Sequence, residues 1–418
     1  MILKKYNPRI ISITGSVGKT STKEAVFVVL AGDFRVRRGE KNYNNEIGLP
    51  LAIIGADSGQ GSILGWLKVF IKGFFIIIFP IKYPEVLILE MGADRPGDIQ
   101  YLTGFIESEI GIVTDISSSH LEFFKNLEAV AKEKWILIRE LDKKSLAVIN
   151  IDNEYMAKLK NQTEAKVITY GFSKEADIRA TDVAFLYDEN NDKQVRGLSF
   201  KLNYQGTSIP VRLNNVLAKH LIYPVLAATA AGTWFGLNLV EIGAALENFC
   251  PLTGRMNLIA GIKNTAIIDD TYNSSPTSSL AAMETLAAIT LGRRKIVVLG
   301  DMLELGNETE SGHRKIAKKF LEIGGDVFLA VGERMQLAVA ELEKNNFSRD
   351  KIFSFKNPTE AVAKLREIIL DGDVILVKGS QGMRMEKIVE GIMIFPQKAV
   401  DLLCRQNTRW KETPFKEI

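Results

Sequence analysis

Cysteine and histidine are scarce in this chain. Its 418 residues include only two cysteines, Cys250 and Cys404, and three histidines. The two cysteines lie far apart and lack the spacing of a metal site, so a disulfide framework is not indicated and a reducing cytoplasm fits. Met1 leads through a mildly basic stretch straight into the first predicted strand. We therefore expect a cytoplasmic protein without a signal peptide.

The chain also lacks a large excess of positive or negative charge. The 53 basic and 50 acidic residues leave a formal net charge of only +3. A protein that binds nucleic acid needs a basic surface to meet the phosphate backbone, and this balance offers no electrostatic case for one. We therefore expect no nucleic acid as the main partner.

One very apolar segment is too short to span a membrane. The most apolar segment is 66–80, and its longest uncharged stretch, 73–81, is well short of the roughly 20 residues that cross a bilayer. We expect a helix that is buried in the fold or packed on a partner. The alternative is an interfacial helix with Lys68, Lys72 and Lys82 at the headgroups. A peripheral membrane or partner contact through 66–80 therefore stays open.

The chain does contain enough apolar residues, 46%, for two or three ordinary domains. β-branched runs alternate with helical patterns on both sides of a predicted hinge at 251–254. The runs typical of buried parallel strands are 86–90, 110–114, 146–150, 265–268, 295–299, 327–331 and 374–377. The predicted fold class is α/β, with a mostly parallel sheet followed by a second, Rossmann-like α/β domain.

A glycine loop stands between a first strand at 9–14 and a helical pattern at 20–30. Its residues are Gly15, Ser16, Val17, Gly18, Lys19, Thr20 and Ser21. Strand, glycine loop and helix together aim backbone N–H groups and a helix N-terminus at phosphate. In such a loop the lysine reaches the β- and γ-phosphates and the threonine hydroxyl binds Mg²⁺. The loop is a variant, because Ile13 stands where the usual pattern has a glycine.

Polar residues of chemical interest cluster where the predicted strands end. They are Gly15, Glu90, Asp270, Asp301, Lys378 and Ser380. Open α/β sheets bind their ligands at this edge, and a hinge between two such sheets predicts a cleft that closes over substrate. His120 follows the strand at 110–114, and Lys134 lies fourteen residues further on. Alone, a histidine is more often structural than a ligand, and Lys134 reads as a solvated helix lysine.

Several blocks together resemble the Mur ligase family, the ATP-dependent amide ligases of peptidoglycan synthesis. They are residues 13–21, 44–50, 89–93, 269–273, 299–306 and 377–386. The resemblance implies three parts: a Mur ligase central ATP-binding domain at 1–251, a Mur ligase C-terminal Rossmann-like domain at 252–395, and a tail at 396–418.

The resemblance also implies roles for residues around the glycine loop. Lys19 binds the phosphates of ATP, while Thr20 and Glu90 ligate Mg²⁺. His120 ligates a second Mg²⁺. Lys134 matches a lysine that the family carbamylates with CO₂, which turns a cation into an anion and suits a site with two divalent metals.

Further roles follow for the second half of the chain. Arg255 matches an arginine that contacts the γ-phosphate when the domains close, and Asp270 matches the acid that binds the ATP ribose. The residues that the resemblance assigns to substrate binding are Asn44, Asn45, Asp301, Lys378 and Ser380.

The implied reaction joins D-Ala-D-Ala to a UDP-N-acetylmuramoyl tripeptide through an acyl phosphate. Two alternatives stay open: a ligase acting on another carboxylate, of polyglutamate or lipid-linked type, and an ATP-binding partner subunit without catalysis. The family usually places a domain before the P-loop to hold UDP, whereas the P-loop strand here begins near residue 9. We therefore expect UDP to be held differently or by another chain, or to be absent from the substrate.

Overall fold

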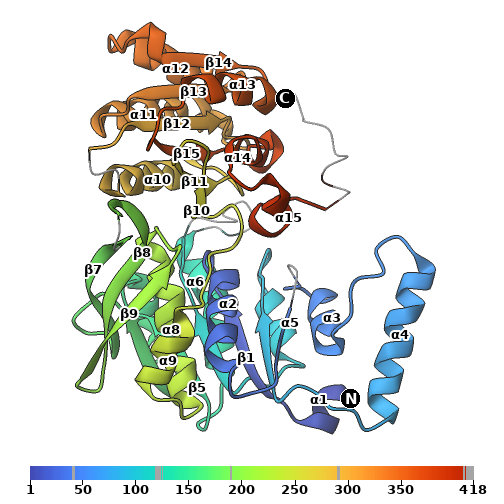
Figure 1. Cartoon of the computed structure of the whole chain (residues 1–418). Helices are drawn as coiled ribbons and strands as arrows, with labels where there is room; N and C mark the ends of the chain where they lie inside the picture. Colours follow the sequence, from blue (N-terminus) through green and yellow to red (C-terminus); the bar gives the residue numbers. More distant parts are fainter. Residues whose placement is uncertain are drawn as a thin grey trace. The chain divides into compact units, whose positions relative to one another are not determined.

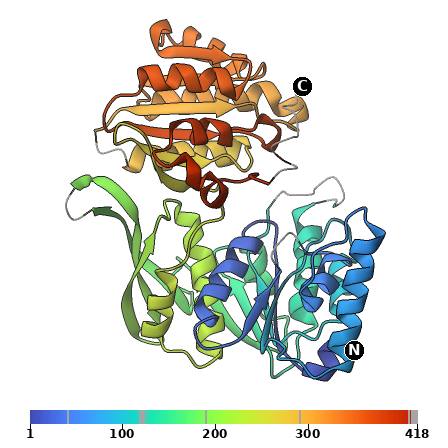
Figure 2. The same ribbon diagram turned by 45° about the vertical axis from the view of Figure 1, so that its right-hand side comes forward.

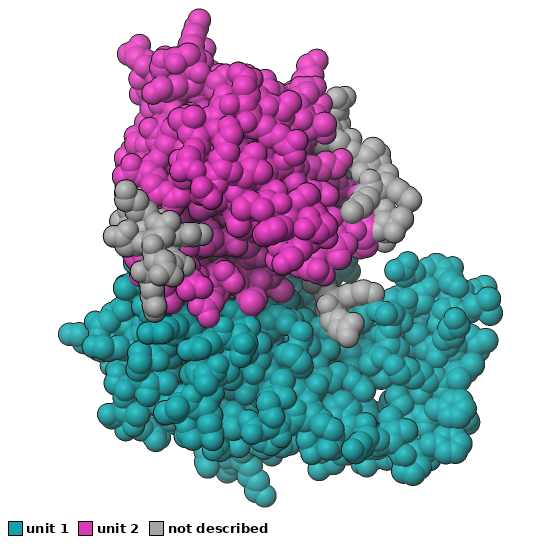
Figure 3. Space-filling view, in the orientation of Figure 1, with its two compact units in different colours: residues 1–184, 199–213, 219–249 teal, residues 185–198, 214–218, 250–418 magenta. Residues whose placement is uncertain are grey.

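The computed structural model describes residues 1–39, 43–117, 124, 126–188, 191–289, 292–407 and 410, with the backbone alone at 188 and 191–194. The chain divides into two compact units, coloured separately in Figure 3. The first comprises Met1–Ala184, Ser199–Leu213 and Lys219–Phe249, and the second comprises Phe185–Leu198, Asn214–Ala218 and Cys250–Ile418. The main division along the chain therefore falls after Phe249.

A nine-stranded sheet in the order β2-β3-β1-β4-β5-β6-β7-β8-β9 forms the larger layer. Its strands are β1 (Arg9–Thr14), β2 (Val36–Arg38), β3 (Val86–Glu90), β4 (Ile110–Val113), β5 (Leu146–Asn150), β6 (Lys166–Gly171), β7 (Ile178–Asp188), β8 (Asn191–Tyr204) and β9 (Thr207–Asn214). The pairs from β2 to β7 are parallel. Their central strands are buried on both faces, which explains the unbroken Ile, Val and Leu runs. The predicted mostly parallel sheet is confirmed.

Helices cover both faces of this sheet (Figures 1 and 2). One layer contains α2 (Lys19–Leu30), α8 (Ile222–Trp234) and α9 (Leu239–Leu246), which pack against one another. The other layer contains α3 (Gly48–Ile54), α5 (Asp98–Thr103), α6 (Leu127–Arg139) and α7 (Glu154–Leu159), with α1 (Ile2–Tyr6) and α4 (Ile63–Ile78) outside α3. A short 3₁₀ turn, η1 (Lys219–Leu221), precedes α8.

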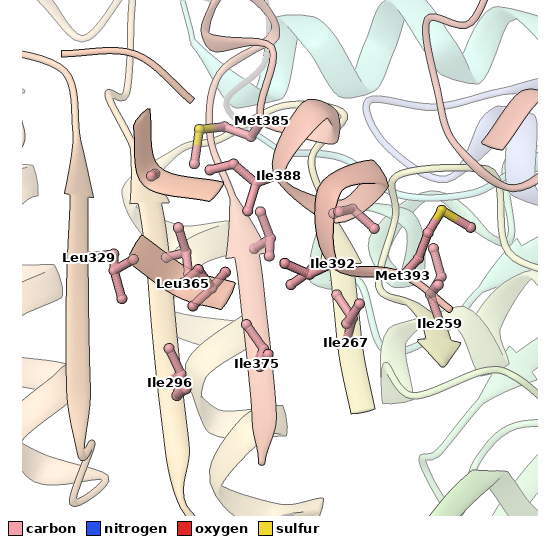
Figure 4. Packing of buried hydrophobic residues seen from close by; sticks show 14 of the residues in the cluster. Ile259, Ile267, Ile296, Leu329, Leu365, Ile375, Met385, Ile388, Ile392 and Met393 are labelled. Carbon is pink, nitrogen blue, oxygen red and sulfur yellow. The ribbon is translucent and has the colours of Figure 1, made fainter. Parts of the chain in front are cut away.

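The second unit is built on a six-stranded sheet in the order β10-β11-β15-β12-β13-β14. Its strands are β10 (Asn257–Ala260), β11 (Ala266–Asp270), β12 (Lys295–Gly300), β13 (Val327–Val331), β14 (Ile352–Phe355) and β15 (Val374–Lys378). Only β10 pairs antiparallel; the other pairs are parallel. Figure 4 shows side chains of β11, β12 and β15 meeting Leu365, Ile388 and Ile392 from the covering helices.

Helices again lie on both faces of this sheet. The helices are α10 (Pro276–Ile289), α11 (Thr309–Glu322), α12 (Gln336–Lys344), α13 (Pro358–Ile368), α14 (Glu386–Ile392) and α15 (Ala399–Leu402), with 3₁₀ turns η2 (Gly306–Glu308), η3 (Arg349–Lys351), η4 (Gln381–Met383) and η5 (Pro396–Lys398). Helices α10, α11 and α12 form one layer, and α13 packs with α14 in the other. The predicted second α/β sheet is confirmed.

One sequence expectation was wrong in part. The apolar segment 66–80 is helical, but α4 is not buried in the fold. Only Val69, Gly73 and Ile76 of this helix are buried, while its other large apolar side chains are mostly exposed. A helix that is apolar all around can be buried in a core, or it can pack one side on the core and expose the other. The apolar pattern of the sequence does not distinguish these two cases.

Candidate active site

The glycine loop follows β1 at the carboxyl end of the sheet. Gly15 and Gly18 have φ angles of 146° and 84°, a backbone conformation that glycine adopts without steric cost. A Cβ at Gly15 would lie 1.9 Å from Oγ1 of Thr114, so no side chain fits there. Gly18 is also the N-cap of α2. The loop therefore delivers the chain directly into a helix N-terminus, where backbone donors favour an anion.

Neighbouring strands hold the loop in place. The Thr114 hydroxyl, just beyond β4, donates to the carbonyl oxygen of Val17 at 2.6 Å. The backbone N–H of Ser16 donates to the Asp115 carbonyl at 2.7 Å, and the Ser16 hydroxyl contacts the backbone of Ser117. These bonds tie the loop to the strand beside it. Sequence reasoning missed Thr114; its place as the last residue of the predicted strand 110–114 was the available signal.

Lys19 and Thr20 open α2 at the mouth of the loop. Lys19 Nζ donates to the carbonyl oxygen of Gly15 at 2.6 Å. The Thr20 hydroxyl donates to Oε2 of Glu90 at 3.0 Å. Glu90 ends β3, whose register places it beside Ile13 of β1, and its side chain is buried. Residues 70 positions apart in the sequence thus form one hydroxyl–carboxylate pair, and the Mg²⁺ that the resemblance implies for them stays a prediction.

Lys134 is buried on α6, with 3% of its surface exposed. Burial is the main cause that lowers the pKa of its ammonium group to about 8, and the charge of Lys19 lowers the pKa further. The carboxylates of Glu133, Asp94 and Asp98 oppose this shift only in part. Lys134 is therefore not the solvated helix lysine that its sequence context alone would suggest. The structure makes it an electrostatic neighbour of the P-loop lysine.

Glu133 fixes the position of this part of α6. Its Oε2 accepts from the N–H of Gly97, and its Oε1 accepts from the N–H of Ile99, both at 2.9 Å. These amides stand at the start of α5, so the carboxylate caps that helix and offsets its dipole. Sequence reasoning missed Glu133, and only its place next to Lys134 hinted at it.

Three further candidates belong to the first unit, and the structure describes two of them, Asn44 and Asn45. The Asn44 carbonyl accepts from the N–H of Gly92, two residues after Glu90, at 2.7 Å. The Asn45 side chain accepts from the N–H of Gly48 at 2.9 Å and so supports the start of α3. His120, predicted as a catalytic residue and metal ligand, lies outside the described residues.

The second sheet gathers its candidates at its carboxyl edge because β11, β15 and β12 are adjacent. Lys378 Nζ donates to Oδ2 of Asp270 at 2.6 Å and to the carbonyl oxygen of Asn273 at 2.8 Å. The Lys378 and Asp270 side chains are only 2% and 12% exposed. Two residues predicted for different substrates thus form one buried ion pair.

Asp301 and Ser380 also bind groups of the protein. The Asp301 carboxylate accepts from the backbone N–H groups of Arg334 and Met335 at the start of α12, at 3.2 and 2.8 Å. Burial raises the pKa of Asp301, although these two bonds oppose the rise. The Ser380 hydroxyl accepts from the N–H of Leu303 at 2.8 Å. Both side chains hold the loops of this edge together.

Arg255 lies in the second unit and is exposed. Its guanidinium carbon lies 4.3 Å from the centre of the Tyr272 ring, a cation–π contact that leaves the charge accessible. Tyr272 follows β11, so Arg255 belongs to the same edge as Asp270.

Two profiles of one family match the chain. The Mur ligase middle domain matches residues 75–232, and the domain described as "Mur ligase, glutamate ligase domain" matches residues 254–381. Together the two matches cover more than half of the chain. The chain belongs to the Mur ligase family. The resemblance drawn from its motifs is thereby confirmed.

Full-length comparisons agree with this Mur ligase assignment. A UDP-N-acetylmuramoyl-tripeptide–D-alanyl-D-alanine ligase of Bacillus subtilis (strain 168) is 28% identical over 394 residues, which cover 94% of this chain and 78% of the relative. A crystal structure of MurF from Acinetobacter baumannii superposes with a TM-score of 0.75 at 23% identity, covering 93% of this chain and 77% of that one. MurF from Thermotoga maritima in complex with ADP gives a TM-score of 0.70 at 23% identity, covering 93% and 80%. The Mur ligase fold extends over nearly all of this chain.

Proposed function

We propose that this chain is a cytoplasmic, ATP-dependent amide ligase that adds D-Ala-D-Ala to a muramoyl tripeptide through an acyl phosphate. The relatives named above support the substrate class. The observation that carries the proposal is the grouping at the carboxyl edge of the first sheet. A P-loop lysine and a hydroxyl–carboxylate pair lie there, and a buried lysine of lowered pKa is an electrostatic neighbour of the P-loop lysine.

The glycine loop is proposed to hold the ATP phosphates. Lys19 now donates to neutral carbonyl oxygens, and a phosphate oxygen would replace them with a stronger, charge-assisted acceptor. Asp270 is proposed to bind the ribose and Arg255 the γ-phosphate. The exposed charge of Arg255 fits such a contact.

Thr20 and Glu90 are proposed to hold Mg²⁺. Within the described residues, no three His, Cys, Asp or Glu side chains gather as a ready-made metal site. Mg²⁺ suits the existing pair, because it commonly takes one or two protein oxygens and completes its shell with water and substrate phosphates. It would supply positive charge opposite the phosphates. His120 is proposed as a ligand of a second Mg²⁺.

Replacing Glu90 tests this pair without a large change of shape. Glu90→Gln keeps an acceptor for Thr20 but removes the negative charge, so we expect the Mg²⁺ concentration for half-maximal turnover to rise by roughly tenfold or more. The measurement is phosphate release across a magnesium titration. An unchanged magnesium dependence would show that Glu90 does not contact the metal.

Lys134 is proposed to carry a carbamate. A neutral amine nitrogen forms a bond to the carbon of CO₂ and releases a proton, which leaves one negative charge. Only the neutral amine reacts, and a pKa of about 8 in place of 10.5 makes roughly 300-fold more of it available near neutral pH. Burial therefore prepares this lysine for the modification.

In the proposed reaction, an oxygen of the peptide carboxylate bonds to the γ-phosphorus and ADP leaves. The amine nitrogen of D-Ala-D-Ala then bonds to the acyl carbon, phosphate leaves, and the nitrogen loses a proton. Positioning and charge stabilisation contribute most of the rate in phosphoryl transfer of this kind. Asn44 and Asn45 are proposed to serve the carboxylate substrate, and Asp301, Lys378 and Ser380 the amine.

A panel of substrates tests the proposal. Phosphate release and product mass are measured with UDP-N-acetylmuramoyl tripeptide, polyglutamate and a lipid-linked muramoyl peptide, each with and without D-Ala-D-Ala. We expect product only from a muramoyl tripeptide with D-Ala-D-Ala. A product from polyglutamate would favour the open alternative substrate class. ATP binding without turnover on any substrate would favour a binding subunit.

A further inference from the structure

Helix α4 carries an apolar surface that the fold does not use. At 100° per residue, its buried stripe of Val69, Gly73 and Ile76 occupies one side. The opposite side forms an uninterrupted apolar arc of roughly 140°. We call it the α4 apolar face and define it by Leu67, Phe70, Ile71, Phe74, Phe75 and Ile78, whose residues are 47% to 68% exposed.

This arrangement reverses that of an ordinary surface helix, which turns polar residues outward. Figure 1 shows α4 at the edge of the first unit, outside α3. A broad apolar surface of this kind marks a site of interaction, because single exposed apolar residues are common but contiguous ones are not.

The charged residues within α4 and directly after it are all lysines. Residues 58–84 contain three lysines and no aspartate or glutamate. Lys68 and Lys72 lie together at one border of the arc, and Lys82 follows the helix. Lys4 and Lys5 belong to α1, which packs against α4, and Lys5 already donates to the carbonyl oxygens at the end of α4. This concentration stands out in a chain whose net charge is only +3.

The ends of α4 are closed by polar partners. Ser62 caps the first turn by accepting from the N–H of Gly65. At the other end, Lys5 Nζ donates to the carbonyl oxygens of Ile76, Ile77 and Phe79, and the Tyr6 hydroxyl also contacts this turn. A helix with satisfied terminal carbonyls can enter an apolar medium without exposing unpaired backbone groups to it.

We propose that the α4 apolar face docks this enzyme onto the surface of an anionic lipid bilayer. The apolar arc enters the boundary between headgroups and acyl chains, and Lys68 and Lys82 pair with lipid phosphates. Lys72 already donates to the carbonyl oxygen of Gly55. None of the described helices is both long and apolar enough to cross a membrane, so the contact is peripheral. The proposal is independent of which substrate the active site uses.

Two features favour a bilayer over a protein partner. The arc contains no polar side chain to fix the orientation of a protein, whereas specific interfaces place hydrogen-bonding groups around their apolar centre. The single-sign charge at its border also matches a lipid surface, which is uniformly anionic.

Vesicle flotation tests the proposal with the full chain. Vesicles of phosphatidylcholine alone are compared with vesicles containing phosphatidylglycerol, in low salt and in about 0.5 M salt. We expect binding to the anionic vesicles, weaker binding at high salt, and at least a tenfold loss of partitioning for the Phe70→Gln/Phe74→Gln variant. A control variant, Val240→Gln/Leu370→Gln, changes two exposed apolar residues elsewhere and should bind like the wild type.

Folding and oligomeric state are checked in parallel. Circular dichroism and the thermal midpoint should be unchanged in both variants, and turnover in the absence of vesicles should also be unchanged, because α4 lies outside the proposed active site. Absence of flotation with anionic vesicles would overturn the proposal. So would concentration-dependent dimerisation that the Phe70→Gln/Phe74→Gln change abolishes in the absence of vesicle binding, since the face would then join two copies of the chain.

Discussion

Two lysines, one at the carboxyl edge of each sheet, are almost equally buried but have opposite surroundings. Lys134 beside the first sheet is 3% exposed and has another cation, Lys19, as an electrostatic neighbour. Lys378 in the second sheet is 2% exposed and lies 2.6 Å from the Asp270 carboxylate. Burial is the main cause that lowers the pKa of Lys134, whereas the equally buried Lys378 has a carboxylate in direct contact with its ammonium group. Similar burial therefore accompanies two different arrangements, a lysine near another cation and a lysine in an ion pair.

The carboxyl edges of the two sheets also differ in the partners of their other polar side chains. At the first sheet, Lys19 donates to backbone carbonyl oxygens and Thr20 to the Glu90 carboxylate, and the proposed phosphate would replace the acceptors of Lys19. At the second sheet, Asp301 and Ser380 already bind backbone amides of the protein. Substrate roles at the second edge therefore require that protein contacts be shared or exchanged, and these residues contribute to stability as well.

The largest expected effect is on the P-loop lysine. Lys19→Ala keeps the backbone donors of the loop but removes the charge proposed for the phosphates, and we expect turnover to fall by about 10³-fold. Phosphate release at saturating Mg²⁺ measures it. Wild-type turnover in this variant would show that ATP binds elsewhere. The carboxyl edge of the first sheet would then not be the catalytic one of the two edges.

The second largest expected effect is a loss of ligation activity, and two lysines of α6 provide a matched test of it. Lys134→Ala should reduce ligation by at least about 10²-fold, because the proposed carbamate charge is lost. Lys132→Ala, which removes an exposed lysine two residues away, should change little. Short carboxylates such as formate should restore part of the activity of Lys134→Ala. Full activity of that variant would contradict the proposed role of Lys134.

Substitutions at the carboxyl edge of the second sheet should change the stability of the protein. Lys378→Met leaves the Asp270 carboxylate buried without its partner, so we expect the free energy of unfolding to fall by about 3 kcal/mol. Urea denaturation measures it, with the exposed Lys318→Met as control. The double variant Asp270→Asn/Lys378→Met should recover much of the loss. A single variant as stable as the wild type would show that the pair is not a structural element.

The smallest effect is a pH dependence of stability. The pKa of Lys134 is about 8 in the folded protein and 10.5 in an ordinary lysine. The unfolded chain therefore binds more protons between these values, and stability rises with pH through this window and is lost as pH falls through about 8. From pH 7 to 9 the gain is about 1 kcal/mol. Denaturation in CO₂-free buffer should show this gain in the wild type but not in Lys134→Ala.

The glycine loop and its place between a strand and a helix were predictable from the sequence because their signals are local. The glycine loop, the strand before it and the helix after it lie within about twenty residues. The Thr20–Glu90 pair followed from a general rule, since adjacent parallel strands end at the same edge. The Asp270–Lys378 pair did not follow, because its members are 108 residues apart and each motif suggested a separate ligand.

The sequence by itself determined the α/β class, the P-loop and the family, because backbone preferences, apolar periodicity and motif spacing act over short stretches of chain. Only the tertiary structure decided the state of the individual side chains. Lys134 has a lowered pKa because packing removes it from water and sets it near Lys19, and α4 is exposed because the core takes only one of its apolar sides. The burial of a side chain and the charges near it depend on contacts between segments that are distant in the sequence. The sequence pattern does not show these contacts.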